Sequence, residues 1–88
     1  MSVSSYSWLL EWFYNKGLSK EKTAEEQLKL NYFEAGLVDS FGVMELITEI
    51  ETHFAVRFTE THFQERRFST VGGLIAIVDD LLQSKTGK

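Results

Sequence analysis

The segment GLVDSFGVMELITEI, residues 36–50, contains the end of a loop and the beginning of a helix. Apolar residues recur at helical spacing from position 43 onward, which predicts a helix from Ser40 to about residue 53 or 54 with one buried face. Asp39 or Ser40 can cap the first turn, because a short side-chain oxygen accepts a hydrogen bond from an unpaired backbone amide there. Gly36, upstream of the cap, is predicted to adopt a positive φ.

Two features of this helix start indicate that another molecule docks there. Gly42 lies in the first turn, where glycine costs about 1 kcal/mol relative to alanine. Phe41 and Met44 flank the predicted buried stripe, so they would present apolar surface beside Ser40. A simple helix cap also explains an Asp-Ser pair at this position, and the residue pattern leaves both interpretations open.

The rest of the chain predicts helices and no convincing strand. The expected elements are a first helix over about 4–16, one or two helical turns after the capping box at Thr23, a short third helix from the capping box at Thr61 to about Arg67, and a last helix capped by Ser69 or Thr70. The last helix has an apolar stripe of Val71, Leu74, Ile75, Val78, Leu81 and Leu82. Helix-on-helix packing is the layer arrangement that remains, which makes the fold class all-α.

The length of 88 residues predicts a single domain over 1–88, with an ordered core at about 4–83 and a polar tail at 84–88. In the first helix, Trp8 and Trp12 are four residues apart and can stack on each other. They would form either the edge of the core or a second interaction surface.

The composition excludes several classes of function. The chain has no cysteine, which argues against disulfides and thiolate metal sites, and Asp79 and Asp80 lack the spacing of metal ligands. The net charge of −4 argues against nucleic acid as a partner. The sequence shows neither a signal peptide nor a membrane span, so we expect a cytoplasmic monomer without membrane insertion.

A self-contained serine hydrolase is not expected, because a serine nucleophile needs a neighbouring base. His53 ends the helix that Ser40 begins, about 20 Å away at 1.5 Å per residue. His62 lies in a different predicted helix, and no pattern places it near Ser40. A serine that another enzyme modifies needs exposure and a recognisable setting, which this position offers.

The setting of Ser40 resembles the phosphopantetheine attachment site of acyl and peptidyl carrier proteins. The similar residues are Asp39-Ser40-Phe41, the preceding segment 33–38 and the following segment 44–46, and the similarity extends over about residues 28–82 and includes 68–71. Most of the family has leucine after the serine, whereas this chain has Phe41. Phenylalanine is apolar like leucine, so the difference bears on the partner or subtype more than on the attachment.

The resemblance implies a four-helix bundle of the acyl-carrier type, with three main helices and one short third helix. It implies that a phosphopantetheinyl transferase moves 4'-phosphopantetheine from coenzyme A onto Ser40, and that the protein is not itself an enzyme. The arm would import the reactive thiol that the cysteine-free chain lacks. An acyl- or aminoacyl-activating ligase and downstream transferases or synthases would then be the other partners.

The resemblance also assigns roles to neighbouring residues. Asp39 would help to hold the metal ion that the transferase binds with coenzyme A. Phe41 and Met44 would form the apolar contact with partner enzymes, while Glu45 and Glu49 would steer basic residues of those enzymes. Phe68 matches a family position near the arm, although a plain core position explains it equally simply.

Other readings of the sequence stay open at this point. The main alternative is an unmodified helical interaction module with a carrier-like fold, and a helix-turn-helix regulator is a more distant one. Arg66 and Arg67 would be either surface residues or determinants of partner choice. The cargo could be a fatty acyl chain, a polyketide intermediate, an amino acid or D-alanine; Phe41 and the aromatic first helix favour a dedicated carrier outside bulk fatty-acid synthesis.

Overall fold

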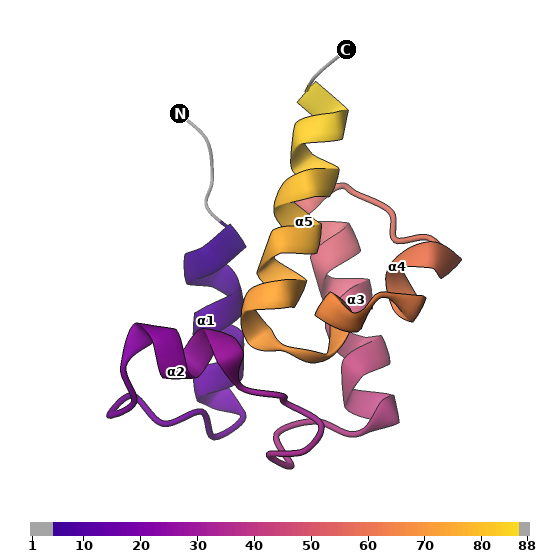
Figure 1. The fold of residues 1–88 in the computed structure, drawn as a ribbon. Coiled ribbons are helices and arrows are strands. Elements are labelled where there is room, and N and C mark those ends of the chain that lie inside the picture. The colour runs from indigo at the N-terminus through magenta and orange to yellow at the C-terminus, as the bar shows by residue number, and fades with distance from the viewer. Residues whose placement is uncertain (1–4, 87–88) are drawn as a thin grey trace.

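The computed structural model describes residues 5–86, and this part of the chain is helical. Its elements are α1 (Ser5–Asn15), α2 (Ala24–Lys29), α3 (Ser40–Phe54), α4 (Glu60–Gln64), the 3-10 helix η1 (Arg66–Ser69) and α5 (Val71–Thr86). Within residues 5–86, extended backbone pairs only at an isolated bridge between Asn31 and Thr70. The predicted all-α class is confirmed. Figure 1 shows α3 and α5 running upward and α1 running downward beside them.

The core lies between the three long helices. Its fully buried side chains include Leu9 and Phe13 of α1, Leu46 and Ile50 of α3, and Leu74, Ile77 and Val78 of α5. The predicted stripe of α5 is confirmed in its first half, whereas Leu81 and Leu82 are only partly buried. The sequence pattern missed Ile77, because α5 contacts α1, α2 and η1 and is therefore buried over a wider face than one stripe.

The two tryptophans of α1 contact α3 instead of stacking on each other, so that prediction is wrong. The Trp8 ring stacks on His53 with 5.0 Å between centroids. The indole Nε1 of Trp12 donates a hydrogen bond to Glu49 Oε1 at 3.2 Å. Both rings are partly buried against the core, which agrees with the edge-of-core interpretation. Tertiary contact with α3 outweighs the local i, i+4 pairing.

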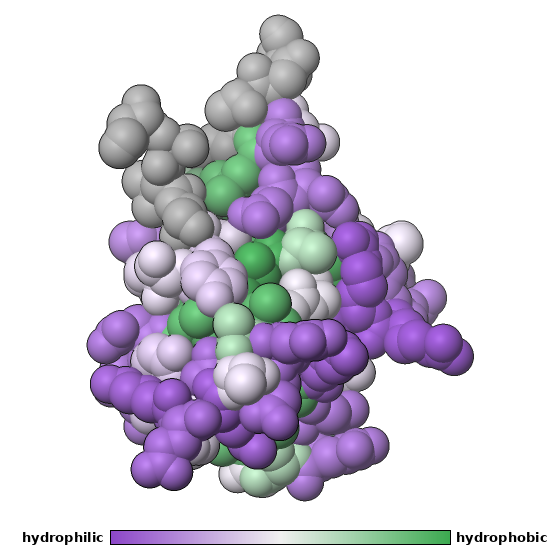
Figure 2. Space-filling model, turned by 60° about the vertical axis from the view of Figure 1, so that its left-hand side comes forward, coloured by the Kyte–Doolittle hydropathy of each residue, from purple (hydrophilic) through white to green (hydrophobic). Residues whose placement is uncertain are grey.

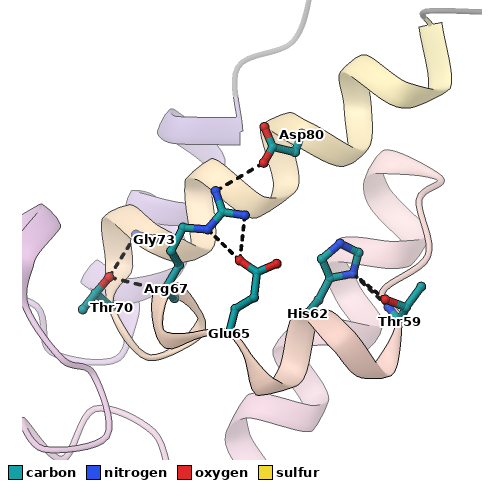
Figure 3. A network of polar contacts seen from close by, with 7 residues as sticks. All are labelled: Thr59, His62, Glu65, Arg67, Thr70, Gly73 and Asp80. Atoms are coloured by element: carbon teal, nitrogen blue, oxygen red, sulfur yellow. Dashed lines mark hydrogen bonds and ion pairs between the residues drawn. The ribbon is translucent and has the colours of Figure 1, made fainter.

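The predicted capping box at Thr23 is confirmed, whereas the predicted start of the short third helix is wrong. Glu26 N–H donates to Thr23 Oγ1 at 3.1 Å, and Thr23 N–H donates to Glu26 Oε1 at 3.0 Å. The short helix α4 is capped by Thr59 rather than Thr61. There the ring nitrogen His62 Nδ1 accepts from the Thr59 N–H at 3.0 Å, in the role that a carboxylate usually has (Figure 3).

A second polar cluster joins η1 to α5. The Arg67 guanidinium contacts the Glu65 carboxylate at 2.7 Å and the Asp80 carboxylate at 3.2 Å (Figure 3). The hydrogen bond to Glu65 is the largest of the effects that raise the pKa of Arg67. The Arg67 and Asp80 side chains are exposed and Glu65 is only partly buried, so these ion pairs are expected to add little to the stability of the fold. Arg67 therefore has an intramolecular partner, while Arg66 is exposed.

The start of α5 is closely packed. Thr70 Oγ1 accepts from the Gly73 N–H at 3.0 Å, so Thr70 rather than Ser69 caps the helix. A Cβ atom on Gly73 would lie 2.0 Å from the Arg67 carbonyl oxygen, and one on Gly72 would lie 2.9 Å from the Leu28 carbonyl oxygen. Only glycine lets η1 and α2 approach α5 this closely.

The far end of α5 reaches Thr86 and includes the first residues of the predicted tail. The predicted first residue of the opening helix, residue 4, and the last two tail residues, 87–88, lie outside the described residues. On the face shown in Figure 2, hydrophilic residues surround a narrow band of hydrophobic ones. No helix within residues 5–86 has the length and apolar character needed to cross a membrane.

Candidate functional site

The loop that leads to Ser40 is held by its own backbone and one asparagine. Asn31 Oδ1 accepts from the N–H groups of Phe33 and Glu34, each at 3.0 Å. The Leu37 N–H then donates to the Tyr32 carbonyl at 3.0 Å. Gly36 has a φ of +76°, which confirms the predicted left-handed conformation. The loop therefore holds the residues just before α3 in a defined position.

Asp39 caps α3, and Ser40 is the first residue of the helix. Asp39 Oδ1 accepts from the Gly42 N–H at 2.8 Å. A Cβ atom on Gly42 would lie 3.3 Å from Val38 Cβ, so a small residue suits the closeness of the capping loop. Ser40 is exposed, and no group in the described part of the chain hydrogen-bonds its hydroxyl. The capping task falls to Asp39, which leaves the Ser40 hydroxyl available for chemistry.

Ser40 borders an open cavity of about 670 Å³ between the end of α1 and the start of α3. The lining combines apolar and charged side chains: Lys16, Phe33, Leu37, Val38, Asp39, Phe41 and Glu45, together with Ser40 and the glycines 36 and 42. Lys16 offers a cation to the phosphate of a phosphopantetheine group, and Phe33, Leu37 and Val38 offer apolar contacts to the methylene groups beyond it. The residues present therefore fit a phosphopantetheine group on Ser40.

The predicted partner residues lie together on the exposed side of α3. Phe41 is 88% exposed and Met44 is 56% exposed, which confirms that this helix presents apolar surface outward. Both residues, with Glu45 and Glu49, line a hollow on the outer face of the helix. Glu49 also accepts the hydrogen bond from Trp12, so it has an intramolecular role beside any contact with a partner.

Phe68 lies apart from this group. It is buried, and its ring packs edge-on against Phe63 with 5.3 Å between centroids. Its carbonyl accepts a hydrogen bond from the buried Tyr32 hydroxyl. Phe68 does not line the cavity beside Ser40. The structure thus places it in the core, and a contact with the arm stays a prediction.

Neither histidine is part of the cavity beside Ser40. His53 stacks on Trp8 in the last turn of α3, and His62 Nδ1 accepts a hydrogen bond from the Thr59 N–H at the start of α4. In the described part of the chain, no three acidic, histidine or cysteine side chains gather in a way that could hold a metal ion. The chemistry that this arrangement supports is modification of an exposed hydroxyl by another protein.

One residue near the site was missed by the sequence reasoning. Lys16, the residue after α1, lines the cavity beside Ser40. Tyr32 is fully buried under the loop, and burial raises the pKa of its hydroxyl above the usual range. No local pattern identifies Lys16, because most of the cavity that it lines is formed by residues about twenty positions further along the chain.

Comparison with known proteins agrees with this geometry. Residues 19–78 match the protein family described as "Phosphopantetheine attachment site". The chain belongs to this family. It is a carrier protein that bears a covalently attached 4'-phosphopantetheine, and it acts as a substrate of other enzymes instead of catalysing a reaction.

The carrier is also similar to proteins named D-alanyl carrier protein. Those from Lacticaseibacillus rhamnosus and Lacticaseibacillus casei (strain BL23) are each 32% identical over 62 residues, which cover 70% of this chain and 76% of the relative. The protein of the same name from Bacillus velezensis is 31% identical over 62 residues, covering 70% of this chain and 80% of the relative. No solved structure matches the carrier.

Proposed function

We propose that Ser40 is the attachment residue and that the carrier delivers an amino acid, of the D-alanine class, as a thioester. The observation that carries the attachment is the division of tasks at the start of α3. Asp39 supplies the cap, whereas the adjacent Ser40 hydroxyl is exposed, unpaired within the described residues and open to a cavity of suitable lining.

The other described serines are poorer candidates. The hydroxyls of Ser5, Ser19 and Ser69 all hydrogen-bond within the fold, to Asp79, to the Glu21 N–H and to the Arg66 carbonyl respectively. Ser7 and Ser84 are exposed on helices, and neither lines the cavity that Ser40 borders. Ser40 therefore combines exposure with a shaped surrounding that the others lack.

The proposed loading step is a phosphoryl transfer. The Ser40 Oγ bonds to the phosphorus that bears the pantetheine group in coenzyme A, and the pyrophosphate bond to adenosine 3',5'-bisphosphate breaks. In this proposal the hydroxyl proton passes to a base of the transferase. Asp39 stays close to the transferred phosphate and, as the family resemblance implies, would contact the metal ion of the transferase.

The cargo is proposed from the relatives. Once loaded, the terminal thiol of the arm would hold the amino acid as a thioester. An ATP-dependent ligase would activate the amino acid, and downstream transferases would accept it. Phe41 and Met44 would contact these enzymes in turn, and a monomer keeps both side chains accessible. The use of coenzyme A and of an activating ligase supports the predicted cytoplasmic location.

The test is the intact mass of the carrier after incubation with coenzyme A, Mg²⁺ and a broad-specificity phosphopantetheinyl transferase. The parent and the control variant Ser7→Ala should each gain one phosphopantetheine, and Ser40→Ala should gain none. Gain in Ser40→Ala would move the attachment to another residue. A folded parent that gains nothing with several transferases would favour the unmodified interaction module.

The cargo is tested on the loaded carrier with a panel of activating ligases. Ligases for D-alanine or another amino acid should add one aminoacyl group, which mild hydroxylamine removes because it cleaves thioesters. Charging by fatty acyl ligases alone would contradict the proposed aminoacyl cargo while leaving the attachment to Ser40 intact.

A further inference from the structure

Lys16 is brought to the attachment site by the turn that ends α1. The Gly17 N–H donates to the Tyr14 carbonyl at 3.1 Å and the Leu18 N–H donates to the Phe13 carbonyl at 2.9 Å. This turn needs a φ of +116° at Gly17. A Cβ atom on Gly17 would lie 3.5 Å from Leu37 Cδ2, so the end of α1 packs against the loop that leads to Ser40.

The charges around Ser40 are unbalanced without Lys16. The cavity is lined by two carboxylates, those of Asp39 and Glu45, and by one cationic side chain, that of Lys16. Attachment of the arm converts the neutral Ser40 hydroxyl into a phosphodiester with one negative charge at any physiological pH. The new charge therefore forms next to two like charges, which disfavours it unless a cation is close.

The Lys16 ammonium is placed to supply that cation. Its Nζ lies 5.0 Å from the centroid of the Trp12 ring, a weak contact at an exposed site. No salt bridge found within residues 5–86 involves Lys16. A phosphodiester is a stronger partner than a ring face for a strongly hydrated ammonium, because the pairing is between full charges.

We propose that Lys16 is a positioning residue that pairs with the phosphodiester on Ser40 and so holds the base of the arm against the end of α1. The inference rests on the proposed attachment to Ser40. Lys16 leaves the Trp12 ring when the arm is attached, and the arm gains one fixed contact beside its covalent bond. Orientation of the arm toward the α1 side of the cavity is the functional consequence.

The experiment compares apo and loaded forms of the parent with those of Lys16→Met, Lys16→Arg and Lys20→Met. Lys20 is a matched control, since its Nζ also lies 5.0 Å from an aromatic centroid, that of Tyr14, but Lys20 does not line the cavity. Intact mass confirms loading of each variant before two measurements are made. These are the melting temperature in 50 mM and 1 M NaCl, and the ³¹P NMR signal of the phosphodiester.

Loading should lower the melting temperature of Lys16→Met more than that of the parent, by about 1 to 5 °C at low salt, as expected for an exposed ion pair in a small domain. The difference should vanish in 1 M NaCl, where screening is strong. Lys16→Arg and Lys20→Met should behave as the parent does, and the ³¹P signal should move in Lys16→Met alone.

Three outcomes would overturn the proposal, and they are distinguishable. If the parent is not loaded on Ser40, the proposed attachment fails and the pairing fails with it. If all variants are loaded but Lys16→Met and Lys20→Met show the same melting temperatures and the same ³¹P signal as the parent, only the role of Lys16 is wrong. A Lys16→Met protein that melts lower in both the apo and loaded forms, with an unmoved ³¹P signal, would assign Lys16 to the fold instead.

Discussion

The starts of α3 and α5 have the same local capping motif but different surroundings. In each, a capping side chain accepts a hydrogen bond from the N–H of a glycine three residues later: Asp39 from Gly42 at 2.8 Å, and Thr70 from Gly73 at 3.0 Å. The first turn of α5 is packed against η1 and α2, whereas the first turn of α3 exposes Ser40 and Phe41.

The difference shows that a capping motif fixes where a helix begins but not what surrounds that beginning. At Gly73 a Cβ atom would overlap the Arg67 carbonyl, and at Gly42 it would meet Val38 only at the tight end of normal contact, 3.3 Å. The α5 start is therefore a closely packed contact with η1. The α3 start leaves Ser40 and Phe41 exposed beside an open cavity.

The two glycines give the largest expected contrast. Gly73→Ala should destabilise the fold by about 3 kcal/mol or more, because the backbone of η1 must move to admit a methyl group. Gly42→Ala should change the free energy of unfolding by about 1 kcal/mol or less, since the helix propensity of alanine offsets the tight contact. Urea denaturation measures both. Equal losses in the free energy of unfolding for the two variants would contradict the difference in packing between the two helix starts.

Tyr32 contacts the segments that precede both helix starts. Its carbonyl accepts from the Leu37 N–H on the side of α3, while its N–H donates to the Ser69 carbonyl and its hydroxyl donates to the Phe68 carbonyl on the side of α5. Tyr32→Phe should lower the free energy of unfolding by about 1 to 3 kcal/mol, because the buried Phe68 carbonyl loses a donor. Denaturation at pH 7 measures this loss.

The buried hydroxyl of Tyr32 also predicts that stability depends on pH. Burial raises the pKa of Tyr32 in the folded state, so above about pH 10 an unfolded tyrosine releases a proton that the folded one keeps. Stability is therefore lost as the pH rises, by up to about 1.4 kcal/mol per pH unit from this residue. Tyr32→Phe should show a flatter alkaline slope than the parent in urea denaturation. An unchanged slope in Tyr32→Phe would contradict the burial argument.

The capping residues give the smallest expected effects on stability and the sharpest one on function. Thr70→Ala and Asp39→Ala should each destabilise the fold by about 1 kcal/mol, as a lost cap does. Asp39→Ser should keep most of the parental stability, because serine also caps a helix. Its loading by the transferase should nevertheless be slower than that of the parent, because the carboxylate is missing. The initial rate of mass gain measures loading. A normal rate in Asp39→Ser would show that Asp39 is a cap only.

Much of the fold could be predicted from local patterns. The apolar spacing placed α3 and most of α5, Thr23 with Glu26 placed α2, and Gly36 predicted a positive φ that the structure has. The predictions failed where a distant segment decides the outcome. Trp8 and Trp12 contact α3, and Ile77 is buried because several elements surround α5.

The features of the candidate site were likewise predicted only in part. The sequence by itself determined the position of Ser40 at a helix start and the exposure of Phe41 and Met44, because helix periodicity and capping chemistry act within a few residues. Only the tertiary structure decided that a cavity opens beside Ser40 and that Lys16 lines it. Those features depend on how the end of α1 packs against the loop before α3, and a contact between segments about twenty residues apart has no signature in local spacing.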